Sequence, residues 1–280
     1  MGERKIVLLK SMKKVLFLEY KFRDFSDEEI KLSGAHSVMA AFEKLNEDRM
    51  KQIKRLGFEF GVSFVSTPGG NTCPLSPFAK KFCEQKLERI LKLNPEIIWF
   101  DYLMFPGKWT VQKQGTWKQG IHDECRYCKG KDRRQEIFRL AQRYFEAIPD
   151  SIERGFFSMP FEIGRFNRWD KKLGQDVRLL GSVFDYISPM LYHRMIDKPV
   201  SYIHKHVNYL SKLRLEAKIL PIIQLKDMPD DIPDSLSIKE INTEIHEAIK
   251  IPSSGVAIFS WDQAIEKNKL EGVSKIIRSI

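Results

Sequence analysis

Short apolar runs alternate with longer amphipathic segments along this chain, and that order constrains the fold more than any other feature. Seven runs rich in Val, Ile and Phe predict buried strands, and Ile6–Leu9 is a candidate for an eighth. The seven are Val15–Tyr20, Phe58–Val65, Ile97–Tyr102, Gly155–Met159, Phe184–Ser188, Ala217–Ile223 and Gly255–Trp261. Between them we expect helices at about 38–55, 79–93, 133–148, 172–182, 201–214, 238–250 and 263–278. This alternation is typical of βα units around a parallel sheet.

Successive parallel units either close into a barrel or form a doubly wound open sheet. Four polar residues favour the barrel, because Asp101, Glu162, Tyr192 and Asp262 fall at or beyond strand carboxyl ends, where barrel enzymes build their sites. No glycine-rich nucleotide loop follows the first strands, which removes the usual reason for an open sheet. We therefore predict a (β/α)8 barrel over residues 1–280 as one domain. Its first strand is expected to be incomplete or irregular, and a long cysteine-containing loop is expected at about 106–133.

The charge pattern and the apolar runs restrict partners and location. The net charge is +10, but the Lys and Arg residues are interspersed with carboxylates, so we do not expect a nucleic-acid partner. No stretch reaches the roughly 18 apolar residues of a membrane span. Lys10, Lys13 and Lys14 interrupt the apolar residues near the amino terminus, which is unlike a secretory signal. We expect a cytoplasmic protein, and the oligomeric state is left open.

One carboxylate, Asp101, interrupts the buried-strand run that leads from Ile97 to Pro106. Burying an unpaired carboxylate is costly, so Asp101 must lie at the open end of its strand or be held by strong partners. The structural alternative is a carboxylate that bonds a neighbouring loop.

Three motifs carry a resemblance to a known group. The chain reads DYLMFP at 101–106, DYISPMLY at 185–192 and GVAIFSW at 255–261. With these motifs it resembles a family of glycoside hydrolase-like (β/α)8 barrels over residues 58–262, and the α-amylase and α-galactosidase clans more distantly. Such families often have Arg where this chain has Met104, so one expected substrate or carboxylate contact is missing.

The resemblance implies cleavage of an oligosaccharide or glycoconjugate, a reaction that usually needs two carboxyl groups and no cofactor. We assign Asp101 as nucleophile or transition-state stabiliser and Glu162 as general acid/base. Carboxylates competing for these roles are Glu19, Asp185 and Asp262. Side chains expected to contact substrate are Tyr102, Tyr192, His193, Trp261 and Asp262, although buried aromatic residues are more often core.

Cysteines provide a second constellation. Cys125 and Cys128 are spaced to hold one tetrahedral zinc, and His122 or Cys73 would complete the shell. A disulfide or redox pair, or ordinary packing, is the alternative reading.

Two other classes of function stay open. One is a non-catalytic carbohydrate-binding barrel, which is consistent with Met104 at the position where similar families often have Arg. The other is a zinc-stabilised interaction or nucleic-acid protein, which would require basic charge to converge near Cys125 and Cys128. No GxSxG elbow and no HExxH motif occurs, so serine-triad and zincin chemistry are not expected.

Overall fold

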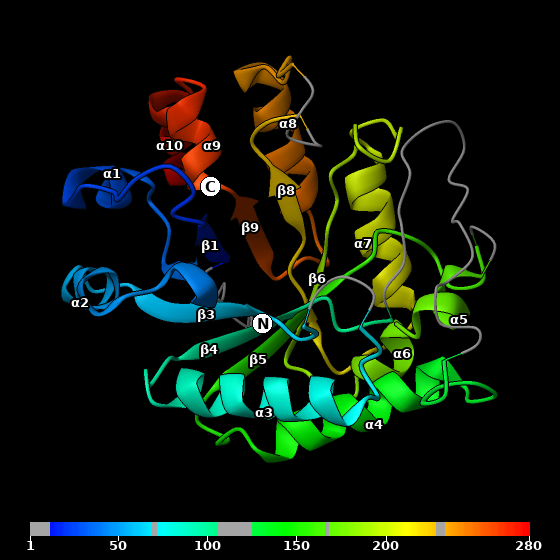
Figure 1. The fold of residues 1–280 in the computed structure, drawn as a ribbon. Coiled ribbons are helices and arrows are strands. Elements are labelled where there is room, and N and C mark those ends of the chain that lie inside the picture. The colour runs from blue at the N-terminus through cyan, green and yellow to red at the C-terminus, as the bar shows by residue number, and fades with distance from the viewer. Residues whose placement is uncertain (1–11, 69–71, 106–124, 166–167, 228–232) are drawn as a thin grey trace, which may run out of the picture.

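The computed structural model describes residues 12–68, 72–105, 125–165, 168–227 and 233–280 (Figure 1). Its strands are β1 (Lys13–Leu18), β2 (Ser37–Ala41), β3 (Glu59–Val65), β4 (Ile97–Asp101), β5 (Glu153–Ser158), β6 (Tyr186–Pro189), β7 (Lys218–Ile219), β8 (Ile222–Gln224) and β9 (Gly255–Phe259). Its helices are α1 (Asp27–Leu32), α2 (Glu47–Arg55), α3 (Pro77–Leu91), α4 (Arg133–Glu146), α5 (Trp169–Leu173), α6 (Val177–Leu180), α7 (Tyr202–Lys212), α8 (Ile238–Ala248), α9 (Trp261–Glu266) and α10 (Leu270–Ser279). A 3-10 turn, η1 (Phe42–Lys44), follows β2.

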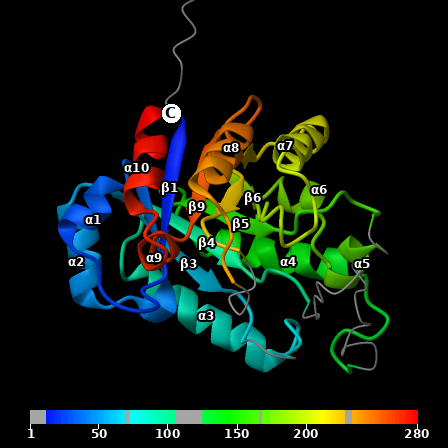
Figure 2. The same cartoon turned by 90° about the horizontal axis from the view of Figure 1, so that it is seen from above.

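The strands form a closed parallel barrel. Each strand from β1 to β6 pairs with the next, and β1 also pairs with β9. Strands β7 and β8 are two parts of one stave, since Leu220 donates its N–H to Ile187 of β6 and Pro221 accepts from Ala257 of β9, each at 2.9 Å. Helices surround the strands when the molecule is seen from above (Figure 2). The predicted (β/α)8 barrel is confirmed.

Polar side chains begin several of the helices. The side chains of Asn46, Ser76, Asp132 and Ser237 each accept a hydrogen bond from a backbone N–H in the first turn of the helix that follows. Pro77 adds a fixed φ to the start of α3. No described helix is both long and apolar enough to cross a bilayer.

The sequence prediction was wrong about one strand. Residues 38–55 were expected to form one helix, but Ser37–Ala41 is β2, and α2 begins only after the Asn46 cap. Met and Ala are good helix formers, so this strand lacks the β-branched signal that marks the others. The first strand is regular, because β1 pairs on both edges. The candidate strand Ile6–Leu9 lies outside the described residues.

The barrel interior is filled and has a charged floor. Trp99 is buried in an interior cluster that includes Val15 and Phe157, and a Cβ at Gly155 would lie 2.5 Å from its ring, so glycine is required there. At the amino ends of the strands, Lys13 lies 3.1 Å from Glu59 and 2.5 Å from Glu153. Ion pairs therefore lie across the amino ends of these strands.

Candidate active site

A cavity of about 460 Å³ lies at the carboxyl ends of the strands. Most of its lining is apolar, and it includes Phe17, Phe157, Phe259, Met159, Met190 and Met195. The side chains with polar groups are Asp101, Tyr102, Gln175 and Tyr192. This is the mouth at which barrel enzymes place their chemistry.

Asp101 is the last residue of β4, half-buried, and lines this cavity. Its Oδ1 accepts a 2.8 Å hydrogen bond from the N–H of Tyr102, and its backbone carbonyl accepts from the N–H of Ser66 at 2.8 Å. No Lys, Arg or His among the described residues forms an ion pair with its carboxylate. Burial raises the pKa of Asp101 to about 7, and the carboxylate of Glu43 adds to the rise. A carboxyl group with this pKa is partly protonated at neutral pH and can donate a proton.

Tyr102 follows Asp101 with a left-handed backbone, at φ 53°. This conformation is unfavourable for an aromatic residue, and such strain is concentrated at functional sites. It turns the chain at the strand end so that the Tyr102 N–H meets the Asp101 carboxylate. The Tyr102 side chain lines the cavity and is 53% exposed, so its ring is available to a ligand.

Tyr192 lies in the connection after β6 and also lines the cavity. Its ring stacks on Phe259 with centroids 5.9 Å apart. Burial raises the pKa of the Tyr192 hydroxyl, and Asp101 and Glu19 add to the rise. The hydroxyl group is therefore a neutral donor in the neighbourhood of Asp101.

The structure does not bring Glu162 to this cavity. Glu162 lines a separate hollow together with Lys198 and Tyr202, and its carboxylate lies 3.5 Å from Arg165. Glu162 comes four residues after Ser158, where β5 ends, so the intervening loop sets its direction. Two carboxylates that act on one bond must reach the same bound substrate, and only Asp101 lines the cavity.

His193 is buried against helix α8 and does not line the cavity. Its Nε2 lies 2.8 Å from Glu244 and 3.3 Å from Glu240, and its Nδ1 lies 2.9 Å from the carbonyl oxygen of Lys198. Burial opposes protonation, but the contacts with Glu244 and Lys198 outweigh it and raise the pKa of His193. This arrangement ties the β6–α7 connection to α8.

Trp261 and Asp262 begin helix α9 and have structural partners. Trp261 is fully buried and donates its Nε1–H to the carbonyl of Glu29 at 2.9 Å. Asp262 accepts the backbone N–H groups of Glu19 and Lys21 at 2.8 and 2.9 Å. Both were expected to contact substrate, but in the structure Trp261 bonds α1 and Asp262 bonds the residues that follow β1.

The sequence reasoning missed several cavity residues. Phe157 and Phe259 point into the barrel on alternating strand positions, so a strict period of two would have selected them. Gln175 and Met195 come from connections, where periodicity carries no signal. Met104 lines the cavity, at the position where the resembling families often have Arg.

No protein-family model and no curated protein matches this chain. Several solved structures of other proteins match it. The glycoside hydrolase domain of PgaB (BpsB) from Bordetella bronchiseptica matches with a TM-score of 0.71 at 8% identity, over 95% of this chain and 99% of that one. A class V chitinase mutant from Cycas revoluta gives 0.63 at 10% identity, over 94% and 99%. The spore cortex-lytic enzyme SleL from Bacillus cereus gives 0.60 at 8% identity, over 96% and 74%.

The chain shares the barrel fold of these enzymes. At identities this low the likeness shows the fold alone, and function must be argued from the site.

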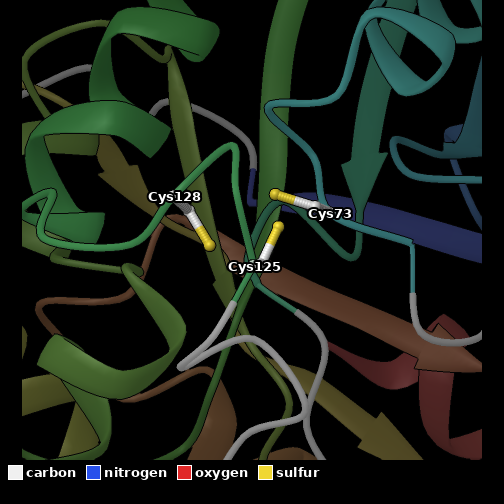
Figure 3. A group of neighbouring side chains, drawn as sticks. All are labelled: Cys73, Cys125 and Cys128. Atoms are coloured by element: carbon white, nitrogen blue, oxygen red, sulfur yellow. The ribbon is translucent and has the colours of Figure 1, made fainter.

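Three of the four predicted metal ligands lie together. Cys73, Cys125 and Cys128 offer sulfur atoms that all lie within 4.8 Å of one another, and Figure 3 shows the three side chains converging. His122 lies outside the described residues. Beside this cluster, a hollow of about 400 Å³ is lined by Cys128 and six cationic residues, namely Lys129, Lys131, Arg133, Arg134, Lys171 and Lys172. Basic charge thus gathers next to the cysteines.

Proposed function

We propose that this protein is a glycoside hydrolase in which Asp101 is the general acid. The observation that carries the proposal is a carboxyl group at the end of β4 that lines the cavity, has no cationic partner among the described residues and has a pKa raised to about 7. A general acid is most effective when its pKa lies near the working pH. The proposal changes the role expected for Asp101 from nucleophile or transition-state stabiliser to proton donor.

The cavity favours a mechanism with one protein carboxylate. Glu162 lines another hollow, so it is not included in the proposed machinery. In substrate-assisted glycosidases an acetamido group of the sugar replaces the second carboxylate. One structural neighbour, the Cycas revoluta chitinase mutant, was solved in complex with (GlcNAc)3. We therefore take a 2-acetamido sugar as the first substrate class to test.

The reaction would proceed in two balanced steps. Protonated Asp101 gives its proton to the glycosidic oxygen while the bond from that oxygen to the anomeric carbon breaks, and the acetamido oxygen forms a new bond to that carbon. The Asp101 carboxylate then takes a proton from the water that opens the resulting ring. The exposed ring of Tyr102 and the hydroxyl of Tyr192 would contact the sugar.

Activity of matched variants tests this proposal. Wild type, Asp101→Asn and Glu162→Gln would be assayed on chito-oligosaccharides and on aryl glycosides of N-acetylglucosamine. Asp101→Asn should lower kcat/KM by about 100- to 10,000-fold while the circular dichroism spectrum is unchanged. Glu162→Gln should stay near the wild-type value. Full turnover by folded Asp101→Asn would exclude the proposal, and an equal loss in both variants would favour the two-carboxylate mechanism.

A non-catalytic carbohydrate-binding barrel is the second candidate, and two observations favour it. The lining is mainly apolar, and Met104 occupies the place of a frequent Arg. Calorimetry with the same oligosaccharides separates the two: binding by wild type without turnover, and unchanged binding by Asp101→Asn, is the result expected of a binding protein.

The hollow next to Cys128 bears on the third class, an interaction protein. Its cationic lining is the convergence of basic charge that such a protein requires. Arg134 is already paired with Asp132 at 2.9 Å, and Arg133 donates to the carbonyl of Lys172 at 2.9 Å. Binding of a polyanion such as heparin that weakens steeply with salt would support this class.

A further inference from the structure

Three cysteine side chains from two distant segments meet at the mouth of the barrel. Cys73 lies in the connection between β3 and α3, while Cys125 and Cys128 lie in the turn that leads into α4. Cys73 and Cys128 are buried, at 5% and 3% exposure, and all three are free thiols. A disulfide would use two of these sulfur atoms and leave the third without a role, whereas a metal ion uses all three.

The backbone turns tightly after Cys125. The carbonyl oxygen of Cys125 accepts from the N–H groups of Cys128 at 3.1 Å and Lys129 at 2.8 Å, which closes a tight turn. Gly130 follows with φ 73°, a left-handed conformation that favours glycine. The sulfur atoms of Cys125 and Cys128 therefore both lie close to the sulfur atom of Cys73 (Figure 3).

We propose that Cys73, Cys125 and Cys128 hold a structural zinc ion. Zinc–sulfur bonds of about 2.3 Å in a tetrahedral shell place the sulfur atoms about 3.8 Å apart. This spacing is compatible with the observed cluster, whose sulfur atoms all lie within 4.8 Å of one another. A structural zinc takes four ligands. Among the described residues no other His, Cys, Asp or Glu joins this cluster, so these residues supply three of the four ligands. Soft thiolate ligands at tetrahedral spacing select zinc over calcium or magnesium.

The ion would cross-link two loops beside the cavity. The β3–α3 connection begins at Ser66, which donates its N–H to the backbone carbonyl of Asp101. The turn at Cys125–Cys128 ends the long connection that starts after Asp101. Zinc would fix the segment at Cys73 and the turn at Cys125–Cys128 relative to each other, and none of the three cysteines lines the cavity. This inference does not depend on the proposed reaction, because metal content and folding are measured without a substrate.

Metal analysis of matched cysteine variants tests the site. Protein purified without chelator should contain one zinc per chain by elemental analysis. Cys73→Ser and the double variant Cys125→Ser/Cys128→Ser should each lose the metal and melt at lower temperature. Cys83→Ser is the control, because Cys83 is also buried but bonds the carbonyl of Ser66 outside the cluster. It should retain the zinc.

Cobalt substitution tests the same site in the wild-type protein, so it gives an answer even if a cysteine variant does not fold. Wild-type protein exchanged into cobalt should develop the sulfur-to-metal charge-transfer band and the strong visible bands of a tetrahedral thiolate site. Zinc at background level in the wild type would overturn the proposal, as would zinc retained by the double variant. Iron in place of zinc, or a disulfide detected by thiol titration of the denatured protein, would also overturn it.

Discussion

The two ends of the barrel hold carboxylates in opposite electrostatic settings. At the floor, Glu59 and Glu153 share the ammonium group of Lys13, which also lies 4.9 Å from the centre of the Tyr186 ring. At the mouth, Asp101 has no ion-pair partner among the described residues, and burial raises its pKa to about 7. A nearby cation offsets the cost of burying a carboxylate, whereas a partly buried carboxylate without a cation destabilises the fold, and its pKa shifts toward neutral pH. The two ends therefore differ in whether their carboxylates have a cationic partner among the described residues.

The largest effect on stability should come from breaking the floor. Lys13→Met removes the cation nearest to Glu59 and Glu153 and leaves Glu153 only the more distant Lys218, at 3.9 Å. We expect a loss of about 2 to 3 kcal/mol in the free energy of unfolding, less than for a fully buried pair. Urea denaturation measures it. The double variant Lys13→Met/Glu153→Gln should recover part of the loss. An unchanged unfolding midpoint in Lys13→Met would show that the floor pairs contribute nothing.

Removing the mouth carboxylate should have the opposite sign. The pKa of Asp101 is raised in the folded state, so folding binds a proton and the stability of the wild type falls as pH rises from about 4 to about 7. Asp101→Asn removes this dependence. Its unfolding free energy should exceed that of the wild type above pH 7, and the difference should shrink as the pH falls and vanish below about pH 4. A variant that is less stable at pH 8 would mean that the carboxylate supports the fold.

Replacing Tyr102 should have a smaller effect on stability. This residue combines a strained backbone with a proposed ligand contact. Tyr102→Gly should relieve the left-handed backbone and leave stability equal or higher by about 0.5 to 1 kcal/mol. The same change removes the exposed ring, so oligosaccharide affinity should fall by about three- to tenfold. Tyr102→Phe keeps the ring and is the control. Unaltered affinity in the glycine variant would remove Tyr102 from the proposed site.

The position of Asp101 could be predicted from sequence because the residue ends a continuous buried strand. Strand periodicity and parallel pairing place every strand end at the same edge, which locates Asp101 and the cavity together. The position of the Glu162 side chain could not be predicted in this way. Glu162 lies beyond the end of β5, and the loop that follows Pro160 directs it to another hollow. A loop direction depends on tertiary contacts and leaves no periodic pattern in the sequence.

Two further differences have local causes. Trp261 reads as the end of a strand, but the chain already turns into α9 after Ser260, so its ring enters the core. Strand β2 escaped prediction because the short segment Ser37–Ala41 consists largely of residues that also suit helices. The proximity of Cys125 and Cys128 could be predicted from the sequence, because two residues separate them. The proximity of Cys73 to this pair depends on the fold and could be established only from the structure.

Direct titration of the Asp101 carboxyl group tests the central claim, which is that the mouth holds a proton donor poised near neutral pH. Carbon-13 labelling of aspartate, with the Asp101 signal assigned by its absence in Asp101→Asn, allows the protonation of this one group to be followed by NMR. The account predicts a midpoint near pH 7 for Asp101. A midpoint near the ordinary aspartate value of about 4 would contradict it, because the group would then be a carboxylate at neutral pH with no proton to donate.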